Sequence, residues 1–389
     1  MLDWIKPADQ LFPELVRVRR HLHQHPEVGF CEENTSAFVC DYLTALGINH
    51  QRLGKTGVVA ELDSGRPGLT VALRADMDAL PVQEMNELDY ASKNPGVMHA
   101  CGHDAHTTTL LVTAKFLKEN IDCWNGAVKL LFQPAEEAPP GGAKDLIAAG
   151  VLNGVGAIYG LHVSPDITVG QIGLSAGPIM ANSDNFRIRL IGSGGHGAAP
   201  HQTIDAVAIT CQLVNSLQTI VSRNVNPAES AVLTVGKISG GTRFNIVAES
   251  CELLGTVRTL SHETQELVRG RILALTKAAA EANGASYEFE YNYGYPAVIN
   301  PEAGVAIVRQ VGAEVLGADN VVQLQHPSMV GEDFGYYLKQ TPGAFFWLGV
   351  HAADGPYYPL HNPRFNLEER AMVIGVRLFA ALVDYHSKN

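Results

Sequence analysis

Hydrophobic positions along the chain follow two periods, one typical of helices and one typical of strands. Apolar residues at helical spacing predict helices over residues 8–24, 32–46 and 103–119. Short apolar runs predict strands at GVVAELD, LTVALRADMDALP, AVKLLFQPAEE and AIYGLHVSP. Because these strands alternate with helices, the pattern favours an α/β fold with a mostly parallel sheet.

Polar residues directly follow several of these strands, at positions 76–78, 136–137 and 162. Parallel sheets bind ligands at the carboxyl ends of their strands. The pattern therefore predicts that these side chains gather at one edge of the sheet.

The pattern changes near residue 182. The following elements run in the order β-α-β-β-α-β, the split ferredoxin-like arrangement. We therefore expect a second domain over residues 183–293, inserted into a first domain made of residues 1–182 and 294–389. The first domain is expected to close with a helix at LEERAMVIGVRLFAALVDYH.

Composition limits the classes of partner. Apolar residues make up 46% of the 389 positions, enough for a sizeable core, and the net charge is −12. An acidic chain offers no surplus of positive charge for nucleic acid or an anionic membrane. The sequence contains no run of about 18 apolar residues and no pattern of a signal peptide. Six cysteines without paired spacing predict reduced thiols and a cytoplasmic protein.

Candidate chemistry begins at MHACGHDAHTTT, where Cys101 and His103 are two positions apart. In an extended loop that spacing turns both side chains to one side. Thiolate and imidazole are ligands for zinc-like metals. These two residues alone fit a buried free cysteine beside a helix-capping histidine equally well.

Two further motifs supply ligand types. Glu136 and Glu137 end an apolar strand and precede a Pro/Gly loop, where one carboxylate can bind metal and the other accept a proton from water. His162 and His361 each follow an apolar residue in GLHVSP and PLHNPRFN. A cysteine nucleophile with His103 as its base would leave these four residues without a role. A metal site uses them all.

The inserted segment adds three candidates. His196 lies between glycines in GSGGHGAAPH, where backbone can approach a ligand closely, although a plain turn explains it as well. Asn245 lies in GGTRFNIVAES. Arg258, in an apolar strand, either points to solvent or forms a fork for a substrate carboxylate.

Two other motifs receive weaker interpretations. The histidine-rich HLHQHPE, residues 21–27, follows RVRR and ends near a proline, which indicates a polar helix end rather than a metal tract. In VGEDF, Glu332 or Asp333 either approaches the site or caps a helix.

Together the motifs resemble those of the metal-dependent amidohydrolases of the aminoacylase and carboxypeptidase family. The most similar branch holds hippurate hydrolase, bacterial N-acyl-amino-acid hydrolases and plant auxin-conjugate hydrolases. The resemblance covers nearly the whole chain, through RRHLHQHPE, LRADMDALP, MHACGHDAHT, FQPAEE, GLHVSP, GQIGLSAGPIMANSDNF, GGHGAAPH, GEDF and PLHNPRFN.

The resemblance implies a zinc-peptidase-like catalytic domain, an inserted lid that often dimerises, and two divalent metal ions. Zinc or manganese suits the ligands best, and cobalt or nickel is also compatible. By motif position the implied metal ligands are Cys101, His103, Glu137, His162 and His361, with Cys101 bridging. The implied roles of the others are a general base for Glu136, ligand orientation for Asp78, oxyanion stabilisation for His196 and Asn245, and carboxylate binding for Arg258.

We therefore expect hydrolysis of the amide bond of small N-acyl-L-amino acids, hippurate-like or auxin-conjugate-like, by a homodimer or higher oligomer. A dipeptidase or aminopeptidase of the same family is the nearest alternative. A hydrolase with Cys101 as nucleophile and a non-catalytic metal-dependent binder are the others.

Overall fold

The computed structural model describes residues 3–388, which form two compact units. The first unit runs up to Ile179 and includes Val298–His326 and the chain from Asp333 onward. The second consists of Met180–Ala297 and Pro327–Glu332. The second unit thus also takes in residues 180–182, 294–297 and 327–332, which the sequence pattern assigned to the first.

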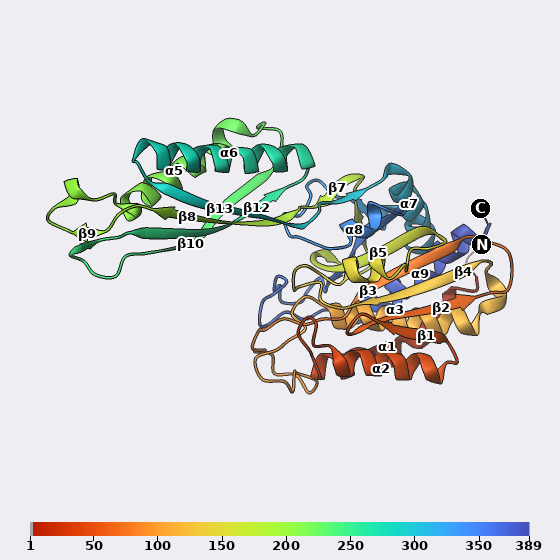
Figure 1. Ribbon diagram of the computed structural model, residues 1–389. Coiled ribbons are helices and arrows are strands. Elements are labelled where there is room, and N and C mark those ends of the chain that lie inside the picture. The colour runs from red at the N-terminus through yellow and green to blue at the C-terminus, as the bar shows by residue number, and fades with distance from the viewer. Residues whose placement is uncertain (1–2, 389) are drawn as a thin grey trace. The chain divides into compact units, whose positions relative to one another are not determined.

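The first unit is built on an eight-stranded sheet, which confirms the α/β class (Figure 1). Its strands, in spatial order, are β1 (Asn49–Leu53), β2 (Gly57–Asp63), β4 (Ala127–Gln133), β3 (Thr70–Asp76), β5 (Val155–Thr168), β16 (Gly343–His351), β6 (Ile172–Leu174) and β15 (Val321–Gln323). The four central strands, β4, β3, β5 and β16, are mutually parallel. Their carboxyl ends therefore lie at one edge.

Helices pack against this sheet. They are α1 (Phe12–Gln24), α2 (Glu33–Ala45), α3 (His103–Glu119), α4 (Ala143–Ala148), α7 (Glu302–Leu316), α8 (Gly335–Leu338) and α9 (Ala371–Lys388). Short 3₁₀ turns occupy Lys6–Leu11, Ile121–Cys123 and Ala318–Asn320. No helix among residues 3–388 is long and apolar enough to cross a membrane.

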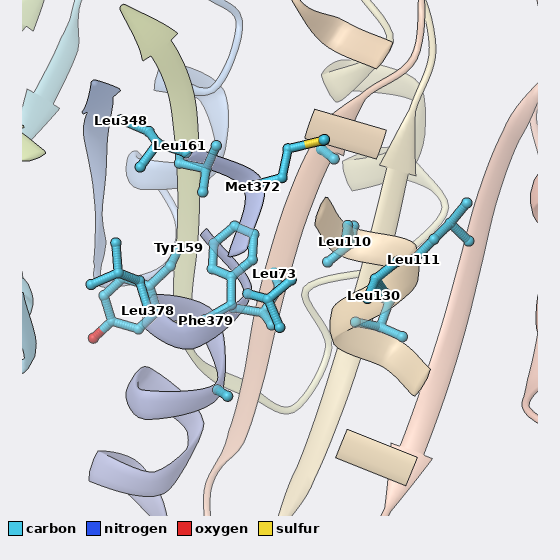
Figure 2. Packing of buried hydrophobic residues seen from close by; sticks show 14 of the residues in the cluster. Leu73, Leu110, Leu111, Leu130, Tyr159, Leu161, Leu348, Met372, Leu378 and Phe379 are labelled. Carbon is cyan, nitrogen blue, oxygen red and sulfur yellow. The ribbon is translucent and has the colours of Figure 1, made fainter. Parts of the chain in front are cut away.

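The core of the first unit lies between the central strands and the helices α3 and α9. Figure 2 shows Leu73, Leu130, Tyr159 and Leu161 from the sheet beside side chains from both helices, among them Leu110, Leu111 and Phe379. These side chains are fully or almost fully buried. Because protein interiors are close-packed, this buried contact fixes the position of α3 relative to the central strands.

The second unit has the elements β8 (Ser183–Ile191), α5 (Ala206–Asn224), β10 (Ala231–Gly240), β12 (Ser250–Thr259), α6 (His262–Ala282) and β13 (Ser286–Tyr295). Its antiparallel sheet has the order β10-β12-β8-β13, and both helices cover one face (Figure 1). A short ladder in this unit pairs β9 (Gly195–His196) with β11 (Ile246–Val247). Another short ladder, of β7 (Gly177–Met180) with β14 (Val298–Asn300), belongs almost entirely to the first unit. A 3₁₀ turn spans Pro200–Gln202.

Candidate metal centre

Cys101 and His103 lie directly before and at the start of α3, separated by Gly102. Gly102 has a left-handed backbone, with φ +85°, and an added Cβ there would lie 2.4 Å from Val163 Cγ2. Only glycine fits this turn without a clash. The turn lets the chain pass against Val163 within β5 and brings Cys101 Sγ to 3.4 Å from His162 Nε2.

The ligand-type side chains form two overlapping groups. Cys101, His103 and His162 form one, and Cys101, Glu137 and His361 form the other. Within each group the candidate donor atoms lie within 4.8 Å of one another. Cys101 is therefore common to both groups. The structure brings together all five residues that the sequence selected as candidate ligands.

Hydrogen bonds determine which ring nitrogen of each histidine faces the group. His162 Nδ1 donates to the carbonyl of Val163 at 2.8 Å, which leaves Nε2 toward Cys101. His103 Nδ1 lies 3.2 Å from Asp78 Oδ1, and its buried Nε2 has no hydrogen-bond partner among the described residues. On its other side the His162 ring meets the indole of Trp347 edge-on, with 5.2 Å between ring centroids.

Asp78 binds several parts of this centre at once. Its Oδ1 accepts from the backbone N–H of Glu136 at 3.0 Å, and its Oδ2 from that of Glu137 at 2.9 Å, in addition to the contact with His103. One buried carboxylate thus fixes a histidine ring and the backbone of both glutamates. Such partners orient metal ligands and raise their basicity.

His106 was not predicted as a site residue, although it lies near His103 and Asp76. Its Nδ1 lies 2.6 Å from Asp76 Oδ1, and its Nε2 accepts the backbone N–H of Val163 at 2.9 Å. Because both ring nitrogens are engaged, His106 braces β5 at Val163 rather than offering a ligand. The signal in the sequence was its i+3 spacing from His103 on one helix face.

Asp333, left open between approaching the site and capping a helix, does approach the site, because its carboxylate lies within 4.8 Å of the Glu136 carboxylate in a close group that also holds Glu332. It also lies in a buried polar network and accepts the N–H of Ala143, the first residue of α4. Its Oδ1 accepts from Arg74 Nη2 at 2.8 Å, and its carboxylate also accepts from Gln133 Nε2 and the backbone of Ala143. Arg74 Nη1 in turn donates to Asp76 Oδ2 at 2.6 Å. The network therefore braces the carboxyl ends of β3 and β4, immediately before the two glutamates.

His361 is held by backbone and by Glu137. It adopts a left-handed conformation with φ +66°, uncommon for a residue with a side chain. Its N–H donates to the carbonyl of Ala100 at 2.8 Å, and its Nε2 lies 3.0 Å from Glu137 Oε1. Its side chain is 46% exposed, so this part of the centre faces solvent.

The electrostatic environment favours a cation. Burial opposes the charge on His103, but the carboxylates of Asp76 and Asp78 outweigh it and raise the pKa of His103 to about 10. Burial, reinforced by Glu137 and Glu136, raises the pKa of the Cys101 thiol well above its usual value. A nucleophilic cysteine needs a lowered pKa, so this environment counts against a free catalytic thiol. A bound cation would instead lower the pKa of the Cys101 thiol.

The residues present fit divalent metal. A thiol, three imidazoles and a carboxylate converge, the buried Nε2 of His103 has no hydrogen-bond partner within the described chain and lies 3.8 Å from Asp76 Oδ2, and the surrounding carboxylates favour positive charge. Sulfur, nitrogen and oxygen donors of this kind bind zinc and related ions.

In the second unit, His196 and Asn245 are neighbours. His196 pairs with Ile246 in the β9–β11 ladder, and the N–H of Gly197 donates to the carbonyl of Asn245 at 2.9 Å. His196 Nδ1 accepts the N–H of Ala198 at 3.0 Å. The neutral imidazole therefore carries its proton on Nε2 and can donate there. Both residues are exposed.

Arg258 lies in β12 and is half-buried, not directed freely into solvent. Its Nη1 donates to the carbonyl of Val257 at 3.1 Å, to that of Asp184 at 3.4 Å and to the hydroxyl of Thr256. Burial lowers its pKa. These three bonds engage only Nη1, so they leave Nε and Nη2 available to a ligand.

Comparison with known proteins places this arrangement in a family. The model of the peptidase family M20/M25/M40 matches residues 72–385. The chain is 49% identical over 298 residues to an N-acyl-L-amino acid amidohydrolase of Geobacillus stearothermophilus, covering 76% of this chain and 80% of that one. It is 44% identical over 361 residues to an N-acetyl-L-cysteine deacetylase of Bacillus subtilis, covering 92% and 85%.

A solved structure supports the same placement. The YXEP protein of Bacillus subtilis, described as a dinuclear metal-binding peptidase of the M20 family, superposes with a TM-score of 0.84 at 34% identity. The match covers 98% of this chain and 99% of that one.

Proposed function

Since the chain belongs to the peptidase family M20/M25/M40 and is a metal-dependent hydrolase of amides, we propose that its substrates are N-acyl-L-amino acids. The products are a carboxylic acid and a free amino acid. The observation that carries the proposal is the sharing of Cys101 by two three-residue ligand groups, directly beside Glu136. The names of the relatives that act on N-acyl amino acids support the substrate class.

We assign the metal ligands to the two overlapping groups. Cys101, His103 and His162 would hold one ion, and Cys101, Glu137 and His361 a second, with the thiolate shared. Divalent ions bound there would polarise the amide carbonyl and acidify a water molecule. Zinc or manganese suits these donors, and cobalt or nickel is compatible.

Glu136 is the proposed general base. It is 5% exposed and lies with His103 and Glu137 in a third close group. Its carboxylate takes a proton from the attacking water and delivers it to the leaving nitrogen. Asp78 keeps His103 and the backbone of both glutamates in place during these transfers.

The proposed roles in the second unit, which would act as a lid, follow from donor chemistry. His196 Nε2–H and the Asn245 amide are assigned to the oxyanion that forms on the substrate carbonyl. The guanidinium of Arg258 is assigned to the α-carboxylate. A free α-carboxylate with a blocked α-nitrogen would separate this substrate class from the aminopeptidase alternative.

We also propose that the protein is cytoplasmic and forms a homodimer or higher oligomer through the second unit. All six cysteines are free thiols, in keeping with a reducing compartment. The edge strand β10 is largely exposed, including Val232 and Ile238, and offers its unpaired backbone edge to a second chain. Sedimentation analysis of the purified protein tests the assembly.

The decisive experiment measures amine release from a panel of N-acetyl, N-benzoyl and indoleacetyl amino acids. Metal-stripped protein is assayed before and after Mn²⁺ or Zn²⁺ is returned. We expect activity to vanish on stripping and to return with metal. The same panel includes unblocked dipeptides, which should be poor substrates.

Two outcomes would contradict the proposal. Undiminished activity of stripped protein, abolished by iodoacetamide, would favour Cys101 as nucleophile. Metal binding without turnover of any panel member would favour a non-catalytic binder.

A further inference from the structure

Arg19 is a buried cation in helix α1 that the proposed chemistry does not use. Its side chain is 1% exposed. A buried guanidinium is tolerated only when its donors are paired. All three of its nitrogens donate: Nε to Asp104 Oδ2 at 3.1 Å, Nη1 to Glu369 Oε1 at 3.1 Å and Nη2 to Asn366 Oδ1 at 3.0 Å.

The acceptors of Arg19 belong to two segments that carry proposed metal ligands. Asp104 directly follows His103 at the start of α3. Asn366 and Glu369 follow His361 in the loop and turn that lead to α9. One planar fork therefore joins the first turn of α3 to the segment that presents His361.

A second side chain of α1 reinforces the first of these links. His23, one turn after Arg19, is also 1% exposed, and its Nδ1 lies 2.8 Å from Asp104 Oδ2. Its Nε2 lies 3.2 Å from Glu84 Oε1. The predicted polar helix end is thus partly buried, since His23 supports the start of α3 whereas His21 is exposed.

The His361 segment holds an uncommon backbone conformation at a partly exposed position, so contacts from other segments help to fix it. His361 has a left-handed backbone and a side chain 46% exposed. Left-handed conformations of residues with a side chain cost of order 1–3 kcal/mol and persist where surrounding structure fixes them. The bonds from Arg19 to Asn366 and Glu369 are part of that surrounding structure.

We propose that Arg19 is a positioning residue for metal binding, which sets the spacing between the His103 and His361 ends of the centre. This inference rests on the proposed function, since it takes both histidines as ligands. Arg19 acts only through Asp104, Asn366 and Glu369.

The test measures Mn²⁺ affinity by calorimetric titration of metal-stripped protein, well below the unfolding midpoint. We expect Arg19→Met to raise the dissociation constant by about 10–100-fold, as loss of a group that orients ligands does. Arg19→Lys should recover only part of the affinity, because a single ammonium cannot reproduce the fork. Asn366→Ala, which keeps both ion pairs, should give a smaller rise and serves if Arg19→Met does not fold.

Two matched controls separate positioning from stability. Arg20→Met removes two bonds to Glu369 but none to Asp104. Arg66→Met removes part-buried bonds to the carbonyls of Ile121 and Trp124, in segments that precede β3 and β4 at the opposite end of these strands. Both variants should keep Mn²⁺ affinity near that of the wild type, whatever they lose in unfolding temperature.

His103→Ala, assayed alongside, separates failure of the inference on Arg19 from failure of the proposed metal site. If His103→Ala loses affinity while Arg19→Met and Asn366→Ala bind as tightly as the wild type, the inference on Arg19 is overturned and the metal site stands. If His103→Ala binds as tightly as the wild type, the proposed metal site fails, and the inference fails with it.

Discussion

The two regions that carry the candidate functional residues are built in opposite ways. In the first unit, buried side chains fix one another: Asp78 holds His103 and both glutamate backbones, and the Val163 carbonyl holds His162. In the second unit, His196 lies exposed in the short β9–β11 ladder, and Asn245 lies exposed directly before β11. Under the proposed roles, folding alone would set the geometry of the metal ligands, whereas the exposed donors would lose their water only when substrate covers them. The first region is therefore preorganised, whereas in the second, part of the substrate binding energy would be offset by the cost of removing water from the exposed donors.

The largest effect in the preorganised region is expected from replacing Glu136, the proposed general base, with a side chain of the same size. Glu136→Gln keeps the size of the side chain and should lower kcat by about 10²–10⁴-fold, because the amide cannot accept a proton. Steady-state kinetics and metal analysis check it together. Retained turnover would remove Glu136 from the role of base, and lost metal would make it a ligand instead.

The exposed region should respond in kcat rather than in metal content. His196→Ala removes a donor to the developing oxyanion and should lower kcat by about 10²–10³-fold with a smaller change in KM. His196→Gln, which keeps an N–H, serves as the matched variant. A change confined to KM would make His196 a binding residue only and would weaken the contrast.

Asp78 tests whether the preorganisation of the ligands matters. Asp78→Ala removes the carboxylate that fixes three groups, and the metal dissociation constant should rise by about 10–100-fold. Calorimetric titration of stripped protein provides the measurement, with Asp145→Ala on the exposed face of α4 as a surface control. Unchanged affinity would mean that packing alone orients His103.

Arg258 is expected to give the smallest effect and the sharpest substrate dependence. Arg258→Met should raise KM for N-acyl amino acids by about tenfold, in line with the ~1.5 kcal/mol of a charge-assisted hydrogen bond. N-acyl amino acid amides, which lack the carboxylate, should show little change. Equal losses on both substrates would rule out a carboxylate clamp.

The local spacing of apolar residues was sufficient to predict the longer helices and strands. Helix α3 spans the residues that helical spacing predicts, and β2 coincides with the apolar run GVVAELD. The short strands β6, β7 and β14 were not predicted, because three or four residues are too few to show a hydrophobic periodicity. The central place of β16 in the sheet also escaped prediction, since pairing with β5 joins residues far apart in the chain.

The candidate site divides in a similar way. The ligand types were visible as motifs, and Glu136 and Glu137 do follow the end of β4. The expectation that His162 follows a strand was wrong, because β5 continues past it to Thr168. Their supports were not visible: Arg19 meets Asp104 and Glu369, 85 and 350 positions away, and Asp333 meets Arg74 at a separation of 259. A buried polar pair of this kind has no local period, so only the fold reveals it.

The contact between Trp347 and His162 gives the metal centre an optical signal of its own. The chain has three tryptophans, and Trp4 and Trp124 make their contacts elsewhere, with Phe116 and the carbonyl of Leu117. Indole emission responds to the charge on a neighbouring imidazole, so it changes when a cation binds to the neutral ring of His162. With Trp4 and Trp124 replaced by phenylalanine, the fluorescence of a single residue would follow the loading of the centre in real time, without substrate.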